Sequence, residues 1–233
     1  MMGPRRYADR DAAGRVLADH LSDYARRRDV VVLGLPRGGV PVAAHVAVAL
    51  QAPLDVLVVR KLGLPGQPEL AMGAIAGVGA DVELVRNDAV LSHAQVAGDA
   101  FEAVHRREVE ELLQREVAYR EGRSRLALGG QVVIVVDDGL ATGSTMRAAV
   151  AAVRRQRPGR LVVAVPVGAD AACETLRTEV DELMCPWIPT LFVAVGQAYV
   201  DFSATSDQQV RRTMAAGIAE PGGPPRPAVP DTT

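Results

Sequence analysis

The chain contains few cysteines and few aromatic residues. Its 233 residues include two cysteines, Cys173 and Cys185, and aromatic residues make up 3% of the total. Two cysteines cannot form the disulfide framework of a small secreted domain, and their scarcity is typical of a reducing compartment. Because 48% of the residues are hydrophobic, the core must consist mainly of Val, Leu and Ala. Such a core is typical of buried parallel strands and the helices that cover them.

Long apolar runs and a strong net charge are also missing. No apolar stretch approaches the ~20 residues of a membrane-spanning helix, and the N-terminal sequence MMGPRRYADR lacks the apolar core of a signal peptide. The formal net charge of −2 gives no basic surface for nucleic acid. The four histidines are scattered without metal-ligand spacing. We therefore expect a cytoplasmic protein with no membrane and no nucleic-acid partner.

Apolar β-branched runs alternate with helix-favouring segments along most of the chain. We predict strands at 30–35, 54–59, 82–86, 132–136, 161–165 and 181–184, and helices at 11–27, 40–50, 92–123, 144–156 and 170–178. This alternation predicts an α/β fold with a doubly wound, mostly parallel sheet and flanking helices. Ligands bind such sheets beyond the carboxyl ends of the strands.

The length favours one core with additions to it, so we predict a single domain over residues 1–219. Residues 62–82 are rich in Gly and Pro and have no regular period, which indicates a mobile loop or ribbon. The charged segment 92–123 is a predicted helical insert, and 185–206 a small hood. Residues 220–233 hold an excess of Pro and Gly, which predicts a disordered tail.

The sequence VVIVVDDGLATGST, residues 132–145, carries the strongest functional signal. A buried strand runs into two adjacent acids, then into a turn of small residues, then into a helix. Such a turn leaves backbone N–H groups unpaired at the positive end of the helix dipole. Small residues and hydroxyls let a phosphate monoester approach these groups closely. The predicted phosphate loop comprises Ala141, Thr142, Gly143, Ser144 and Thr145.

The two acids of this segment are Asp137 and Asp138. Carboxylates beside a phosphate site would repel the ligand unless they bind another part of it. Ribose hydroxyls and Mg²⁺ are the natural partners of carboxylate oxygens, so we predict these contacts. The alternative is a helix N-cap with two solvated acids. A Walker A loop is a poor alternative, because Gly143 is followed by Ser144 and not by Lys.

The segment DDGLATGST resembles the 5-phosphoribosyl-1-pyrophosphate (PRPP) signature of the type I phosphoribosyltransferases, in the form found in adenine-type enzymes. The resemblance implies a Mg²⁺-dependent enzyme of nucleotide metabolism. It would transfer the phosphoribosyl group from PRPP to a small nitrogenous acceptor and release pyrophosphate. It implies that the phosphate loop holds the 5-phosphate, that Asp137 and Asp138 orient the ribose, and that Mg²⁺ arrives with PRPP. Dimers are usual in the family, so we expect a homodimer.

The ends of two other predicted strands carry groups that suit a pyrophosphate. In the resembled family the turn matching Pro36-Arg37-Gly38-Gly39 binds pyrophosphate, often through a non-proline cis peptide, and its glycines allow unusual backbone angles and close approach of an anion. The next predicted strand ends in two cations, a pattern that also resembles adenine-type enzymes. The predicted pyrophosphate ligands are Arg37, Gly38, Gly39, Arg60 and Lys61, and the catalytic candidates are Arg37, Arg60, Lys61, Asp137 and Asp138. The alternatives are a plain strand-to-helix turn and a solvated basic strand end.

Two further segments match variable parts of the resembled family. Residues 62–82 correspond to the loop that closes over the active site, where Glu69 is a candidate contact to Mg²⁺ or the nucleophile and a surface position is the alternative. The hood gathers four aromatic side chains that are candidates for stacking on the acceptor, Trp187, Phe192, Tyr199 and Phe202. The alternative is that these side chains only pack the C-terminal part of the fold.

The identity of the acceptor stays open at the level of the sequence. Ala141 stands where hypoxanthine-guanine-type enzymes have an Asp that faces the base, which argues against an oxopurine and does not exclude adenine. A PRPP-binding regulatory or sensor protein without transfer activity is the alternative function. Arg37, Arg60 and Lys61 favour the enzyme, because a sensor needs less leaving-group machinery.

Overall fold

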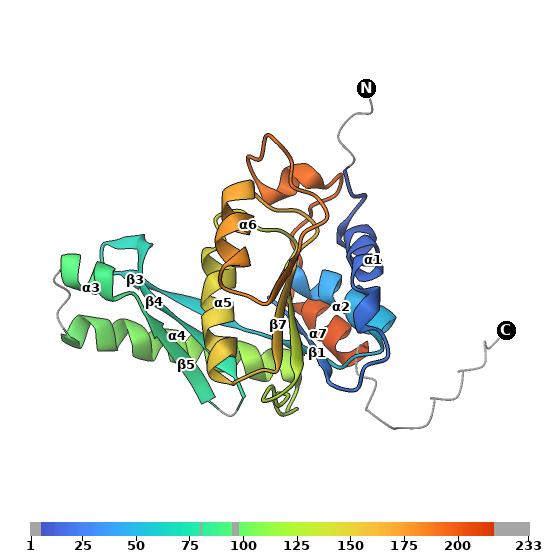
Figure 1. Ribbon diagram of the computed structural model, residues 1–233. Helices are drawn as coiled ribbons and strands as arrows, with labels where there is room; N and C mark the ends of the chain where they lie inside the picture. The colour runs from blue at the N-terminus through green and yellow to red at the C-terminus, as the bar shows by residue number, and fades with distance from the viewer. Residues whose placement is uncertain (1–5, 80, 95–97, 217–233) are drawn as a thin grey trace.

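The computed structural model describes residues 6–79, 81–94 and 98–216, without the side chains of residues 68, 69 and 81. The side chain of Glu69 and the predicted tail 220–233 therefore lie outside the described residues. At the centre is a five-stranded sheet whose neighbouring strands are all parallel. Its strands, in spatial order, are β2 (Leu54–Val56), β1 (Val30–Gly34), β6 (Val132–Val136), β7 (Arg160–Ala164) and β8 (Glu182–Met184). The predicted α/β fold is confirmed (Figure 1).

Alternate residues of the central strands bury against different helices. Val30 and Val32 of β1 pack in one cluster with α1 (Arg10–His20), α2 (Gly39–Leu50) and α7 (Asp207–Ala216). Val31 and Leu33 pack in a second cluster with α5 (Ser144–Arg155) and α6 (Asp170–Arg177). Successive side chains of a strand point to opposite faces, so an unbroken β-branched run requires helices on both. With both faces covered, the expected place for a ligand is beyond the carboxyl ends of the strands.

The sequence predicted a mobile loop or ribbon over residues 62–82, and the described residues of this segment lie mainly in antiparallel strands. They belong to an antiparallel sheet of β3 (Val59–Leu64), β4 (Gln67–Val78) and β5 (Asp81–Arg86), which projects from the main sheet (Figure 1). The glycines here permit close packing: a Cβ on Gly73 would lie 2.5 Å from the Val85 carbonyl oxygen, and one on Gly77 would lie 2.0 Å from Glu116 Oε1. Closure of this hairpin over a ligand stays a prediction.

The predicted helix 92–123 is divided in the structure. A short helix, α3 (Asp88–His93), precedes α4 (Gly98–Arg120), which lies along the projecting sheet (Figure 1). The charged side chains of such a helix usually face water. The structure buries three of them, Glu108, Glu116 and Arg120.

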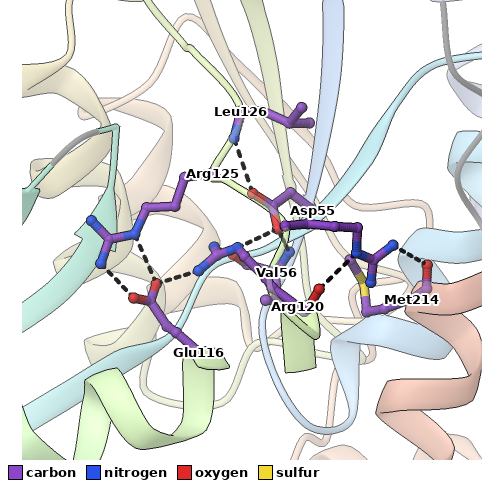
Figure 2. A network of polar contacts seen from close by, with 8 residues as sticks. Asp55, Val56, Glu116, Arg120, Arg125, Leu126 and Met214 are labelled. Atoms are coloured by element: carbon purple, nitrogen blue, oxygen red, sulfur yellow. Dashed lines mark hydrogen bonds and ion pairs between the residues drawn. The ribbon is translucent and has the colours of Figure 1, made fainter. Parts of the chain in front are cut away.

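A buried network of charges anchors the C-terminal part of α4 to the main sheet (Figure 2). Arg120 Nε donates to Asp55 Oδ1 at 2.8 Å, and Arg120 Nη1 lies 2.7 Å from Glu116 Oε1. Arg125 pairs with Glu116, and the Leu126 backbone N–H donates to Asp55 Oδ2 at 3.2 Å. The charged side chains of Asp55, Glu116, Arg120 and Arg125 each have an opposite partner, which is the condition under which buried ions are tolerated. The network fixes the projecting sheet and α4 to β2.

The other element boundaries shift in limited ways. The predicted helix 11–27 ends at His20 and is followed by a 3₁₀ turn, Ser22–Tyr24. The predicted strand 54–59 is divided between β2 and the start of β3. The hood carries a 3₁₀ helix, Val195–Ala198, and lies beside the described N-terminal residues (Figure 1). None of the helices in the described part of the chain is long and apolar enough to cross a membrane.

Candidate functional site

Three turns meet at the carboxyl edge of the main sheet. They follow β1, β6 and β7, and backbone hydrogen bonds join them. The Leu35 N–H donates to the Val136 carbonyl at 2.9 Å, which ties the turn after β1 to the end of β6. The Leu140 N–H donates to the Val167 carbonyl at 2.9 Å, and the Ala169 N–H donates to the Leu140 carbonyl at 2.8 Å. These two bonds join the turn after β6 to the turn after β7. The structure thus brings the predicted phosphate loop, the acidic pair and the Pro36–Gly39 turn to one edge.

The predicted phosphate loop ends at the N-terminus of α5. Gly143, the residue before the helix, has φ 74°, a left-handed conformation that favours glycine. No side chain caps the helix, although the Thr142 and Ser144 hydroxyl oxygens lie 3.1 Å apart at its start. Ala141, Thr142, Ser144 and Thr145 are exposed. The first-turn N–H groups and two hydroxyls are therefore placed where an anion can reach them.

The two acids lie immediately before this loop in different surroundings. Asp137 Oδ1 accepts a hydrogen bond from the Asp138 backbone N–H at 2.8 Å. Burial raises the pKa of Asp137 well above its ordinary value, and the charge of Asp138 raises it further. Burial also raises the pKa of Asp138, and the Arg10 guanidinium opposes that rise. Each carboxyl group is thus desolvated, and a cation or a hydroxyl donor would compensate its charge.

Arg10 is a residue of the site that the sequence did not reveal. Its Nε donates to Asp138 Oδ2 at 2.8 Å, and its Nη2 lies 2.8 Å from the same oxygen. Its Nη1 donates to the Ser203 carbonyl at 2.7 Å. Arg10 lies 128 positions from Asp138 along the chain, and no periodicity or motif links them. Only the fold brings the first residue of α1 to the acidic pair.

The Pro36–Gly39 turn packs directly on the acidic pair. The Pro36–Arg37 peptide bond is cis, as in the resembled family. Gly38 has φ −64° and ψ −33°, so the unusual backbone angles expected for this glycine are absent. Its lack of a side chain matters instead, because a Cβ there would lie 2.0 Å from Asp138 Oδ2. A Cβ on Gly39 would lie 2.7 Å from the Asp137 Cα.

Two of the predicted pyrophosphate groups in this turn differ in their availability. The Gly39 N–H already donates to the Leu35 carbonyl at 3.0 Å, so it is not free for an anion. The Arg37 side chain is exposed, and within the described residues it makes no hydrogen bond or ion pair. Arg37 therefore stays a candidate for an anion beside the acidic pair.

Arg60 and Lys61 lie within a strand and not together at a strand end as the sequence suggested, and their contact with pyrophosphate stays a prediction. They are consecutive residues of β3, so their side chains leave opposite faces of the strand. Arg60 Nη2 lies 2.6 Å from Glu108 Oε2 and 3.1 Å from Glu111 Oε2 of α4. Lys61 is exposed and lines a groove of about 630 Å³ whose other wall includes Ser144 of α5. Lys61 is thus the member of the pair that lies near the phosphate loop.

The hood aromatics pack mainly against the N-terminal segment. The rings of Trp187 and Tyr7 lie 6.0 Å apart edge to face, and those of Tyr199 and Phe202 stack at 5.0 Å. The Tyr199 hydroxyl donates to the Asp138 carbonyl, and burial raises the pKa of Tyr199. Phe192 packs against the same small cluster. The arrangement matches the packing alternative, and acceptor stacking by these side chains stays a prediction.

No preformed metal cage is present among the described residues, since none of their His, Cys, Asp and Glu side chains form a group of three that could hold an ion. Asp137 and Asp138 nevertheless suit a hard cation that brings further oxygen ligands with it. Their oxygens are carboxylate donors, and the burial of both acids favours a compensating positive charge. These residues fit a Mg²⁺ ion that a phosphorylated substrate delivers.

Comparison with known proteins gives consistent findings. The family model described as phosphoribosyl transferase domain matches residues 7–203. Two proteins of Mycobacterium tuberculosis, each provisionally named a phosphoribosyl transferase, are 48% identical over 204 residues. That match covers 88% of this chain and 45% of each relative, so the chain spans about half their length. The crystal structure of TT1426 from Thermus thermophilus is 40% identical with a TM-score of 0.79, covering 92% of this chain and 100% of that one.

Proposed function

Because this chain belongs to the phosphoribosyl transferase domain family, we propose that it transfers the phosphoribosyl group of PRPP to a nitrogen acceptor and releases pyrophosphate. One observation supports this proposal above the others. The turn at Gly38 packs on Asp138, and both lie beside the uncapped N-terminus of α5. Groups suited to an anion therefore lie on the turn that packs against Asp138 and on the loop that follows Asp138 in the chain, with two carboxylates suited to ribose hydroxyls beside them.

In the proposed reaction the chain mainly positions and stabilises the reacting groups. The loop at 141–145 binds the 5-phosphate through backbone N–H groups and hydroxyls. Asp137 and Asp138 accept hydrogen bonds from the ribose hydroxyls. Arg37, the Gly38 N–H and Lys61 stabilise the charge that develops on the pyrophosphate as its bond to C1 breaks. The acceptor nitrogen bonds to C1 from the opposite side and loses a proton, so the configuration of C1 inverts.

A magnesium ion is the proposed cofactor, and Asp137 and Asp138 are the residues that would hold it together with oxygens of PRPP. The ion would supply positive charge to the leaving pyrophosphate. Burial raises the pKa of both carboxyl groups, and a metal ion brought by PRPP would favour their ionised form, so the metal complex of PRPP should bind more tightly than free PRPP. A homodimer is likewise a proposal for this chain, which sedimentation of the purified protein would test.

A PRPP-binding regulator without transfer activity is the second candidate. The ion pairs of Arg60 with Glu108 and Glu111 favour the regulator. They leave one cation fewer to bind the pyrophosphate that a transferase releases. The packing of Tyr199 and Phe202 against each other also leaves fewer aromatic faces for an acceptor. Arg37 and Lys61 remain exposed and favour the enzyme.

The experiment that separates these functions combines binding with turnover. Calorimetry measures PRPP affinity with and without Mg²⁺, and a coupled assay measures pyrophosphate release with a panel of nucleobases. Release with a single acceptor supports the transferase. Tight PRPP binding without release for any acceptor supports the regulator, and absence of PRPP binding contradicts both.

A further inference from the structure

Arg10 connects three parts of the candidate site that are distant in the sequence. Through Asp138 it contacts the acidic pair, and through the Ser203 carbonyl it contacts the hood. Its guanidinium carbon lies 4.0 Å from the centre of the Phe202 ring, within cation–π range. The side chains of Arg10 and Asp138 are only 12% and 14% exposed. Arg10 is therefore held from several sides.

The contacts of Arg10 fall on one oxygen of Asp138. Both Nε and Nη2 approach Oδ2 at 2.8 Å, whereas Oδ1 accepts no hydrogen bond from another of the described residues. Two nitrogens of the planar guanidinium converge on Oδ2, so they hold this oxygen at one place in the site. Arg10 thus holds Asp138 in one orientation and leaves its second oxygen for a ligand hydroxyl.

The charge of Arg10 also matters at this position. Asp137 and Asp138 are adjacent and desolvated, and they lie next to groups suited to two anionic parts of one ligand. Two uncompensated carboxylates would repel such a ligand. The Arg10 guanidinium compensates one of them, and burial of the pair limits screening by solvent.

We propose that Arg10 is a positioning residue for PRPP binding, which orients Asp138 toward the ribose and compensates its charge. This inference rests on the proposed function, since it concerns the same site. It assigns the N-terminal segment a part in donor binding, because α1 begins at Arg10 and the segment before it pairs with the hood through Tyr7. Removal of the guanidinium should weaken PRPP binding through Asp138.

The test measures PRPP affinity in Mg²⁺ for the full chain carrying Arg10→Gln, Arg10→Lys or the control Arg15→Gln. Arg15 lies on the same helix and is exposed. We expect Arg10→Gln to weaken binding about tenfold or more, which is about 1.4 kcal/mol. Arg10→Lys should recover part of this loss because it restores the charge without the fork, and Arg15→Gln should bind like the wild type.

A double-mutant cycle separates positioning from a general structural effect. In an Asp138→Asn background, Arg10→Gln should change PRPP affinity less than about twofold, because the group through which Arg10 acts has changed. Thermal unfolding of each variant checks that the fold persists. If Arg10→Gln does not fold, Arg10→Lys carries the test, and affinity equal to the wild type overturns the proposal.

Two further outcomes would also overturn it. One is wild-type affinity in a folded Arg10→Gln variant, and the other is equal loss from Arg10→Gln with and without Asp138→Asn. Wild-type protein that does not bind PRPP contradicts the proposed function itself. Binding by the wild type, together with unchanged binding by Arg10→Gln, contradicts only the role of Arg10.

Discussion

Replacement of Gly38 by alanine should destabilise the protein although its backbone suits alanine. With φ −64° and ψ −33°, Gly38 lies in the right-handed helical region. Gly→Ala at such a position ordinarily stabilises a protein by about 0.4–1 kcal/mol, because it restricts the unfolded chain. Here the new Cβ would lie 2.0 Å from Asp138 Oδ2, 2.7 Å from its Cγ and 3.3 Å from Arg10 Nε. Whether Gly38→Ala raises or lowers the free energy of unfolding therefore shows how tightly the turn packs on Asp138.

The steric cost should exceed the gain. Overpacking of a well-packed region costs about 1–3 kcal/mol, and Arg10 holds the Asp138 side chain so that it cannot rotate away freely. Subtracting the backbone gain of about 0.4–1 kcal/mol from this cost leaves a net loss of up to roughly 2.6 kcal/mol. For a domain of about 150–250 residues, each kcal/mol lowers Tm by about 2–4 °C.

Thermal and urea unfolding of matched variants measure this effect. Gly98→Ala is the control, because a Cβ at Gly98 meets nothing within 4 Å. In an Asp138→Ala background the two shortest contacts disappear, so Gly38→Ala should lose most of its cost there. A Gly38→Ala protein as stable as the wild type, or equally destabilised in both backgrounds, would refute the reasoning.

Three other variants test separate parts of the account. Asp137→Asn combined with Asp138→Asn should weaken PRPP binding more than about tenfold in calorimetry while the far-ultraviolet circular dichroism spectrum is retained, and undiminished affinity would contradict the assigned ribose contacts. Gly143→Ala should cost about 1 kcal/mol in chemical unfolding, because φ is 74° while a Cβ has ordinary space, 3.6 Å from its nearest neighbour. Arg120→Met should cost about 3–5 kcal/mol, since it leaves buried acids without their partner. Arg27→Met, at an exposed position, should leave the unfolding midpoint unchanged. A similar decrease in stability in the Arg120→Met and Arg27→Met variants would contradict the importance of burial.

The central strands of the fold could be predicted because valine dominates their runs. The run Val132–Val136 is β6 in the structure, and helix α5 follows at Ser144 as the small-residue turn indicated. Unbroken β-branched runs can be satisfied only in a sheet covered on both faces, so the alternation determined the layers. The position of the phosphate loop at the carboxyl edge followed from the rule that parallel sheets bind ligands beyond the carboxyl ends of their strands.

The contacts between distant segments could not be predicted. No local pattern relates Arg10 to Asp138, because their meeting depends on how α1 crosses the strand ends. Gly38 was expected for its backbone freedom, yet its role depends on an acid that lies far along the chain, Asp138. Such packing is a property of the folded chain and leaves no periodic signal in one sequence.

The location of Arg60 and Lys61 was wrongly predicted for a different reason. The expected strand ended at residue 59, so both cations were placed at a strand mouth where they would share one ligand. In the structure a new strand begins at Val59, and its pleat sends the two side chains to opposite faces. The glycines of residues 62–82 made this strand hard to predict. Glycine occurs both where backbones pack closely and where a loop is flexible, and the sequence does not distinguish the two.

We propose that one edge of the sheet binds PRPP between the α5 N-terminus and the turn at Gly38. A crystal structure of the protein with PRPP and Mg²⁺ tests it most directly. We expect the 5-phosphate at the backbone N–H groups of residues 143–145, with the ribose hydroxyls on Asp137 and Asp138. PRPP bound at another surface, or none bound at saturating concentration, would contradict it.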